Sequence, residues 1–183
     1  MSSIHQASSA DWQPKVPSLE TSDWYALQTR VRFERKICQQ IQSRDQEAYV
    51  PLTRERHRWS DRSQTVELPL FPGYVFVRAI SDPADRLAVL QTSGAYAFVT
   101  FQGVVSLIPD QQIKDLQRIE NQNMSWAQYP FLKRGQRVRI AGGCLDGLEG
   151  IFVAEQGRKL VISIEPMERS IAVDIGAYDV ELV

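Results

Sequence analysis

The sequence predicts an α+β protein made of two domains that differ in character. Residues 23–120 alternate short apolar runs with amphipathic helical stripes, which is typical of a sandwich of helices on a sheet. Residues 131–183 contain five short β runs and no helical stripe, so this half can bury a core only by curling into a small five-stranded β-barrel. Between them, residues 121–130 are rich in Asn, Gln, Ser and Pro and are expected to form a linker.

The elements of the first domain follow from apolar runs and helix-start signals. Strands are expected over 24–28, 48–52, 70–77 and 96–101. Helices are expected over 32–42, where apolar residues recur every fourth position, and after Pro83 and Pro109, where a proline follows or precedes a capping side chain. The polar, basic stretch 54–67 has a turn signal near its middle and is expected to form a hairpin arm.

The second domain is predicted from β runs separated by glycine and acidic residues. The runs are 138–140, 151–153, 160–164, 171–173 and 180–182. These runs carry no helical periodicity, and four glycines between 142 and 150 would each cost a helix about 1 kcal/mol relative to Ala. We therefore expect this domain to be β and not to refold into a helical hairpin.

Composition excludes several classes of protein. Of the 183 residues, 43% are hydrophobic and 23% are charged, and the net charge is −1, so any nucleic-acid contact must come from a local patch. No run approaches the roughly 18 apolar residues of a membrane span. Residues 1–22 lack the pattern of a secretory signal and are expected to be a disordered tail. Cys38 and Cys144 lie in unrelated settings, which indicates no disulfide and a cytoplasmic location.

The sequence shows no catalytic, metal or cofactor site. Histidine occurs only at positions 5 and 57, far from either cysteine, so no nucleophile-base pair or metal-ligand cluster is expected. Gly142 and Gly147 have the spacing of a phosphate loop, but Leu148 stands where that motif requires lysine. We therefore expect a protein that is not an enzyme, and we expect it to be monomeric.

The segment from Arg134 to Phe152 resembles the KOW motif. A basic residue and a glycine open an alternating apolar strand, which runs into a loop rich in glycine and closes on Gly150. From the residues alone, the segment could equally be a glycine-rich turn in any small barrel. Ribosomal proteins also carry this motif, so a ribosome-associated or general nucleic-acid-binding protein remains an alternative, although such a protein would be expected to be basic.

The first domain resembles the NGN domain of NusG-type transcription factors. The resemblance rests on Trp24-Tyr25, on Val50-Pro51 and on the run from Phe71 to Val77 after a basic hairpin. It covers residues 23 to 183 as NGN domain (23–120), linker (121–130) and KOW domain (131–183). It implies an antiparallel sheet flanked by helices, followed by the barrel, in a bacterial elongation or antitermination factor. The run 98–101, the segment 105–109 and the short linker also resemble specialised paralogues of the RfaH or UpxY type.

The resemblance implies an apolar pocket that docks on the clamp helices of the largest RNA polymerase subunit. Its expected lining is Tyr25, Phe71, Pro72, Tyr74, Phe76 and Phe98. Strand alternation places Tyr74 and Phe76 on one face and Val75 and Val77 on the other. The alternative is that most of these aromatic side chains belong to an ordinary core.

A basic surface is expected to contact upstream DNA or the non-template strand. Between residues 30 and 62 there are nine Lys or Arg residues against five Asp or Glu residues. The candidates are Arg30, Arg32, Arg35, Lys36, Arg54, Arg56 and Arg58. The alternative is a solvated helix face and a solvated arm.

The glycine-rich loop of the second domain is expected to recruit a further partner. In the family this tip binds a small-subunit ribosomal protein or the terminator Rho. Leu145 occupies the place of the exposed apolar side chain, and Asp146 follows it. The loop departs from the commoner Asp-aromatic pair at Gly147-Leu148, which leaves the partner open. The alternative is that Leu145 and Leu148 both belong to the barrel core.

Overall fold

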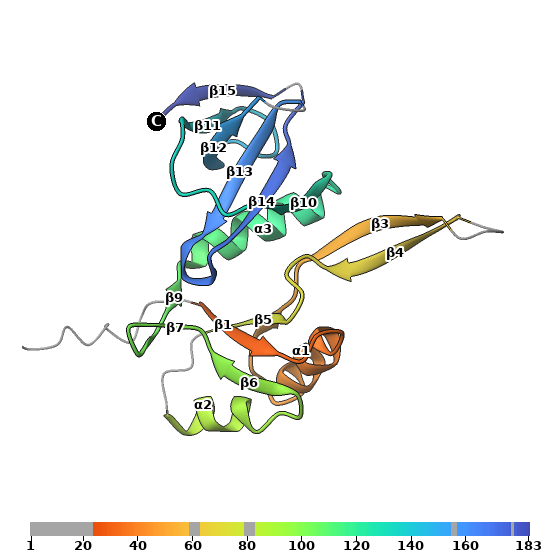
Figure 1. Ribbon diagram of the computed structural model, residues 1–183, viewed down its shortest axis with the longest axis vertical. Helices are drawn as coiled ribbons and strands as arrows, with labels where there is room; N and C mark the ends of the chain where they lie inside the picture. Colours follow the sequence, from red (N-terminus) through yellow and green to blue (C-terminus); the bar gives the residue numbers. More distant parts are fainter. Residues whose placement is uncertain (1–23, 59–62, 79–82, 155–156, 177) are drawn as a thin grey trace, which may run out of the picture.

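The computed structural model has two antiparallel sheets with a helix between them (Figure 1). It describes residues 24–58, 63–78, 83–154, 157–176 and 178–183. From one end to the other, the layers are a pair of helices, the N-terminal sheet, helix α3 and the C-terminal sheet. The α+β class and the order of the two sheets confirm the prediction.

The N-terminal sheet has five strands. They are β1 (Trp24–Thr29), β2 (Ala48–Tyr49), β5 (Tyr74–Arg78), β6 (Ala95–Phe98) and β9 (Leu107–Ile108). The order is β2-β5-β1-β6, with β9 also paired to β1, and all of these pairs are antiparallel. The predicted strand 48–52 is shorter than expected, because Pro51 cannot donate a ladder hydrogen bond and the chain leaves the sheet there.

The two faces of this sheet are covered by different helices. Helices α1 (Glu34–Gln42) and α2 (Pro83–Leu90) cover one face, where Ile37 and Ile41 pack with Leu27, Val75 and Val77. Helix α3 (Asp110–Asn121) covers the other face. Its apolar residues Ile113, Leu116 and Ile119 are buried, as their spacing predicted.

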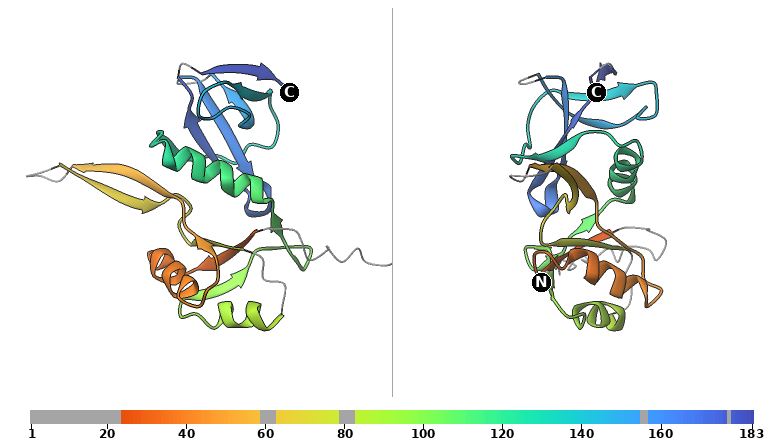
Figure 2. Two further views of the ribbon diagram at one scale, coloured as in Figure 1. Left: turned by 180° about the vertical axis from the view of Figure 1, so that it is seen from behind. Right: turned by 90° about the vertical axis from the view of Figure 1, so that its right-hand side faces the viewer.

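Two hairpins leave the N-terminal sheet. The long one joins β3 (Leu52–Arg58) to β4 (Ser63–Pro69) and projects away from the molecule (Figure 2). The short one joins β7 (Thr100–Phe101) to β8 (Val104–Val105). Gln102 and Gly103 both have positive φ in its turn, the geometry of a tight two-residue hairpin. The long hairpin confirms the predicted arm, although its tip lies outside the described residues.

The C-terminal sheet has six strands. They are β10 (Trp126–Tyr129), β11 (Arg137–Ala141), β12 (Glu149–Val153), β13 (Lys159–Ile164), β14 (Arg169–Asp174) and β15 (Asp179–Leu182), with a 3₁₀ turn η1 (Glu165–Met167) between β13 and β14. The order is β10-β14-β13-β12-β11-β15. All five predicted runs are strands, and the described residues of this half contain no α-helix.

The predicted linker 121–130 is wrong in part. Helix α3 continues to Asn121, and residues 126–129 form β10, which pairs with β14 from Trp126↔Val173 to Tyr129↔Ser170. The reason is tertiary, because the edge of β14 offers hydrogen-bonding groups that a four-residue segment can satisfy. The sequence run is too short to predict such a strand.

One apolar core joins the two halves of the chain. Buried residues of the N-terminal sheet such as Phe76, all three apolar residues of α3, and buried residues of the C-terminal sheet such as Leu160 form a single cluster. Trp126 lies at the junction: its Nε1 donates to the Leu52 carbonyl at 3.0 Å, and its own carbonyl accepts from Thr53 Oγ1 at 3.1 Å. The halves are therefore packed together through α3 and β10.

Candidate docking surfaces

The expected polymerase-binding residues are mostly buried. Phe71, Phe76 and Phe98 are exposed by 3%, 0% and 8%, whereas Tyr25 and Tyr74 are half-buried and Pro72 is exposed. An open pocket lined by all six side chains is therefore not present in this conformation. The alternative interpretation, that most of these aromatics belong to the core, holds for the three phenylalanines.

The six residues also divide between two faces of the N-terminal sheet. Tyr25 and Phe98 meet edge to face, with ring centroids 6.1 Å apart, on the side of α1 and α2. Phe71, Tyr74 and Phe76 lie on the side of α3. The prediction that Tyr74 and Phe76 share one face is confirmed, since Val75 and Val77 pack in the opposite cluster.

The aromatic residues on the α3 side form a tight cluster. Phe76 meets Phe71 edge to face at 5.9 Å and stacks on Tyr49 at 6.3 Å between ring centroids. The Tyr49 hydroxyl donates to Glu120 of α3 at 2.6 Å. Burial, followed by this hydrogen bond, raises the pKa of Tyr49 far above its ordinary value. The cluster thus fixes α3 on the sheet.

Helix α1 contacts the Phe71-Pro72-Gly73 turn through the side chain of its first residue, Glu34. Gly73 has a φ of +83°, a conformation that favours glycine, and its N–H donates to Glu34 Oε1 at 2.6 Å. Glu34 is 1% exposed and opens α1. Its carboxylate therefore joins the first helix to the turn that presents Pro72 and Tyr74.

Exposed apolar side chains that the sequence reasoning missed lie on β6, on the short hairpin and on β9. Tyr96, Phe101, Val104 and Leu107 are exposed by 65%, 70%, 71% and 37%. Phe101 and Val104 are partners across the short hairpin, and Leu107 pairs with Tyr25 in the sheet. The Gln102-Gly103 pair could have predicted the hairpin, but nothing in the sequence shows that its apolar side chains face solvent.

The predicted basic surface is partly neutralised. Glu67 of β4 accepts hydrogen bonds from Arg35 at 2.9 Å and from Arg54 at 3.3 Å. These two arginines, Arg35 first, hold the pKa of the Glu67 carboxyl below its ordinary value. Two further cations lie over the Phe33 ring. The Arg30 guanidinium is 4.6 Å from the ring centre, and the Lys36 Nζ is 5.9 Å from the same ring centre.

The remaining basic residues are more open. Arg32 is exposed and has a φ of +73°. Arg54, Arg56 and Arg58 occupy alternate positions of β3, opposite Glu67, Thr65 and Ser63. The side chains of Arg56 and Arg58 lie outside the described residues. Arg54 also donates to Asn123 at 2.9 Å, which ties the hairpin to the segment after α3.

The expected exposure of Leu145 is wrong. Leu145 is fully buried in the common core, and so is Leu148, as the alternative interpretation held for both. The loop folds back on itself, since Gly147 N donates to the Ile140 carbonyl at 2.9 Å and Asp146 Oδ1 accepts from Gly142 N at 2.6 Å. This turn directs Leu145 inward, while Asp146 is exposed.

The glycine-rich loop is held by α3. Arg118 donates through one nitrogen to the carbonyls of Cys144 at 3.0 Å and Asp146 at 2.9 Å. Asp115 lies one turn earlier on α3, and its burial raises the pKa of its carboxyl above the ordinary value. The predicted partner loop is therefore in contact with the N-terminal half of the chain.

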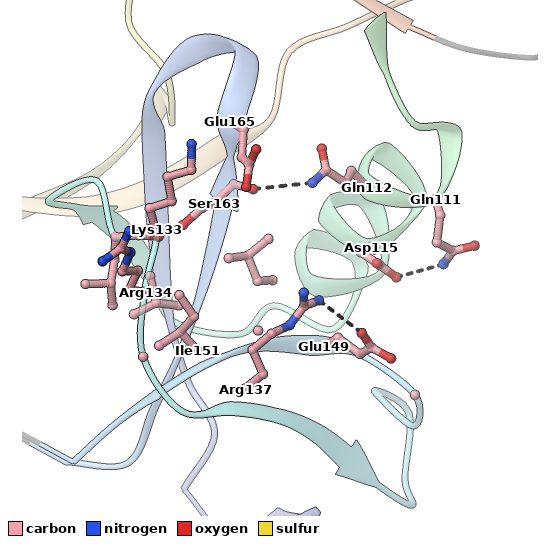
Figure 3. Close-up of a pocket in the computed structure, with 16 residues that line it drawn as sticks. Gln111, Gln112, Asp115, Lys133, Arg134, Arg137, Glu149, Ile151, Ser163 and Glu165 are labelled. Carbon is pink, nitrogen blue, oxygen red and sulfur yellow. Dashed lines mark hydrogen bonds and ion pairs between the residues drawn. The ribbon is translucent and has the colours of Figure 1, made fainter. Parts of the chain in front are cut away.

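A cavity of about 730 Å³ lies between α3 and the C-terminal sheet (Figure 3). Arg137 extends from β11 into its middle, between Asp115 of α3 and Glu149 of β12. Gln112 donates to the Ser163 carbonyl at 3.3 Å across one side of it. Its size lies within the range of small-molecule sites.

Neither a metal cluster nor a membrane helix is found in the part of the chain that the structure describes. Within those residues, His, Cys, Asp and Glu do not form a group of three that could hold a metal ion. No described helix is long and apolar enough to cross a membrane. Both cysteines are free thiols.

Comparison with known proteins decides the family. The family model described as "Transcription termination factor nusG" matches residues 22–117, which is more than half of the chain. The chain belongs to the NusG family. The matched residues contain the whole N-terminal sheet and most of α3.

Relatives and solved structures agree with this family. The chain is 24% identical to the transcription termination/antitermination protein NusG of Lactococcus lactis, covering 86% of this chain and 91% of that protein. It is 23% identical to the NusG of Borreliella burgdorferi, covering 87% and 98%. The structure titled "Domain interaction in Thermotoga maritima NusG" matches with a TM-score of 0.53 and 19% identity, over 88% of this chain and 97% of that chain. The fold is thus that of a NusG-family termination/antitermination factor.

Proposed function

We propose that this NusG-family protein binds bacterial RNA polymerase during elongation and suppresses pausing or termination. The docking surface would centre on Phe101 and Val104, which face each other across the short hairpin, and would draw on the exposed Tyr96 and Leu107 and the half-buried Tyr25. The observation that carries the proposal is the exposure of Phe101 and Val104, at 70% and 71%. Exposed large apolar side chains that lie side by side, as Phe101 and Val104 do across the short hairpin, are typical of a protein-binding site.

The proposed partner element is the pair of clamp helices in the largest subunit. Pro72 and Tyr74 would extend the contact, because they are the accessible members of the aromatic turn. Phe71, Phe76 and Phe98 would act by holding the sheet that presents these side chains. In the described structure, Gln128 of β10 donates to the Leu70 carbonyl at 3.0 Å. Docking at the Phe71-Pro72-Gly73 turn would therefore require β10 to move.

The binding test compares the purified chain with two variants on bacterial core RNA polymerase at low and high salt. We expect Phe101→Ser and Val104→Ser each to weaken binding by about 1–2 kcal/mol, as for interface anchors, with little dependence on salt. Leu182→Ser is the matched control, since Leu182 is 73% exposed on β15. Failure of the folded wild type to bind, or equal losses in all three variants, would overturn the proposal.

The long hairpin is proposed to contact upstream or non-template DNA. Arg54, Arg56 and Arg58 occupy alternate positions of β3, and Arg32 is exposed near the base of the arm. Phosphate contacts release counterions, so this contribution should fall steeply with salt. On an elongation complex with intact upstream DNA, Arg58→Gln should lower affinity at low salt and have no effect on core polymerase alone. An equal effect on both would contradict a DNA role.

The C-terminal domain is proposed to recruit a ribosomal protein or Rho through the loop 142–147. Asp146 is an exposed side chain of this loop, whereas Leu145 is buried. A partner would have to compete with Arg118, which bonds two carbonyls of the same loop. The protein is further proposed to be a specialised, cytoplasmic antiterminator acting as a monomer.

A further inference from the structure

The short hairpin of β7 and β8 presents two large apolar side chains to solvent. Phe101 and Val104 are partners across it and are exposed by 70% and 71%. We propose that residues 12–19, which lie outside the described residues, pack across this hairpin and compete with RNA polymerase for it. The competition rests on the proposed function, whereas the contact between residues 12–19 and the hairpin does not.

The chain that precedes the described structure enters the fold beside this hairpin. Trp24 and Tyr25, at the start of β1, pair with Ile108 and Leu107 of β9. Val104 lies three residues before Leu107, so the hairpin begins within about 16 Å of Tyr25. The start of β1, β9 and the hairpin lie at the same end of the N-terminal sheet (Figure 1).

Residues 12–19 can reach the hairpin. Leu19 lies five residues before Trp24, and Val16 lies eight residues before it. Extended chain covers up to about 3.4 Å per residue, which gives a reach of about 17 Å for Leu19 and about 27 Å for Val16. Both side chains can therefore contact Phe101 and Val104 while the described structure stays as it is.

The segment and the hairpin are both apolar and almost uncharged. Residues 12–19 include Trp12, Val16 and Leu19, and their one charged side chain is Lys15. Residues 100–107 have no charged side chain. A lysine can keep its ammonium group in water while its neighbours pack on an apolar surface. The contact would therefore bury apolar side chains without burying an unpaired charge.

Two prolines favour a suitable conformation for the segment. Pro14 and Pro17 favour the polyproline II helix, which has three residues per turn. Val16 and Leu19 are three residues apart, so they would lie along one edge of such a helix. Proline-rich segments in this conformation dock on exposed aromatic side chains at a low entropic cost. Phe101 is such a side chain.

The short connection to β1 allows a weak contact to be well populated. A short flexible connection gives an effective concentration in the millimolar range. At about 1 mM, a contact with a dissociation constant of about 0.1–1 mM is closed in roughly half to nine-tenths of the molecules. The apparent affinity for polymerase falls in proportion to the open fraction. Loss of the contact should therefore raise this affinity about two- to tenfold.

The contact is tested in the full chain without polymerase. We expect nuclear Overhauser effects between the methyl groups of Val16 or Leu19 and the ring of Phe101. Leu19→Ser should weaken these effects and shift the amide signals of residues 100–107. Ile4→Ser is the matched control, because it also removes an apolar side chain before β1 but lies outside residues 12–19. It should leave the signals of residues 100–107 unchanged.

Two results of this experiment would overturn the proposal. The first is the absence of these effects, or shifts in Leu19→Ser that avoid residues 100–107 and appear around Val31 and Leu68, the other exposed apolar side chains near the sheet. The second is a contact that strengthens with protein concentration, since it would then come from a second copy of the chain.

A polymerase assay separates the regulatory role from the proposed function. Val16→Ser combined with Leu19→Ser should raise the affinity for core polymerase about two- to tenfold, and Ile4→Ser should not. In a chain that also carries Phe101→Ser, the gain should disappear, because the surface under competition is itself changed. An unchanged affinity despite an observed contact would overturn the competition. Failure of every chain to bind polymerase would overturn the proposed function and leave the contact standing.

Discussion

At the scale of single residues, Glu34 shows how a charged side chain can be part of the core. It is 1% exposed, and its Oε1 accepts from the buried N–H of Gly73. We expect Glu34→Ala to lower the free energy of unfolding by about 1–3 kcal/mol, because the Gly73 donor would be left unsatisfied. Urea unfolding followed by circular dichroism measures this loss.

The matched variant for this contact is Glu34→Gln. It keeps an acceptor oxygen at nearly the same place, so the loss should be smaller than in Glu34→Ala. Equal losses would show that the bond to Gly73 contributes little and that the carboxylate acts through its charge.

Leu145 and Leu148 show what single positions of a sequence can and cannot predict. Both lie in a glycine-rich loop, and the sequence allows either an exposed tip or a core position for each. The fold-back from Ile140 to Gly147 turns Leu145 inward. The inward direction of Leu145 depends on a backbone hydrogen bond between loop residues seven positions apart. Hydrophobic periodicity in the sequence gives no information about such a bond.

At the scale of elements, α3 is tied to the first strand by Asp110. Its Oδ1 accepts from Trp24 Nε1 at 3.0 Å, and Lys114 pairs with its other oxygen at 2.6 Å. Lys114 first, and then Trp24, holds the pKa of Asp110 below its ordinary value. A carboxyl with a lowered folded pKa stabilises the fold above its unfolded pKa, and this stabilisation is lost as pH falls through the folded pKa.

The Trp24 indole N–H resonance should therefore titrate with a midpoint below about 3.9, the ordinary aspartate value. Asp110→Asn keeps an acceptor for the indole but removes the charge, so the same resonance should no longer titrate in that range. A wild-type midpoint at or above the ordinary value would contradict the arrangement.

The elements with strong periodicity could be predicted, and those that depend on a distant partner could not. Ile37 and Ile41 in α1, and the three buried residues of α3, were correctly assigned from spacing alone. Strand β10 was missed because its pairing with β14 joins residues more than forty positions apart. The same limit applies to the candidate site: alternation separated Tyr74 from Val75, but only the packed fold shows that α3 covers the face of Phe76.

At the scale of the whole molecule, the two halves share one core through α3. The three buried side chains of this helix contribute to the cluster that holds Phe76 of the first sheet and Leu160 of the second. Trp126 and Arg118 add hydrogen bonds between the halves. The contact between the two halves should raise the free energy of unfolding of the chain. A binding partner that separates the halves should remove that gain.

This shared core predicts one cooperative unfolding transition for both sheets. Leu116 is fully buried in the middle of α3, and we expect Leu116→Ala to destabilise the whole chain by about 2–5 kcal/mol. Calorimetry should give equal calorimetric and van't Hoff enthalpies for the wild type. As the comparison, Val75→Ala changes only the α1 side of the N-terminal sheet, yet it should lower the same single transition. Two separate transitions, with the second unaffected by Val75→Ala, would show that the C-terminal sheet folds independently and that α3 belongs to the N-terminal half alone.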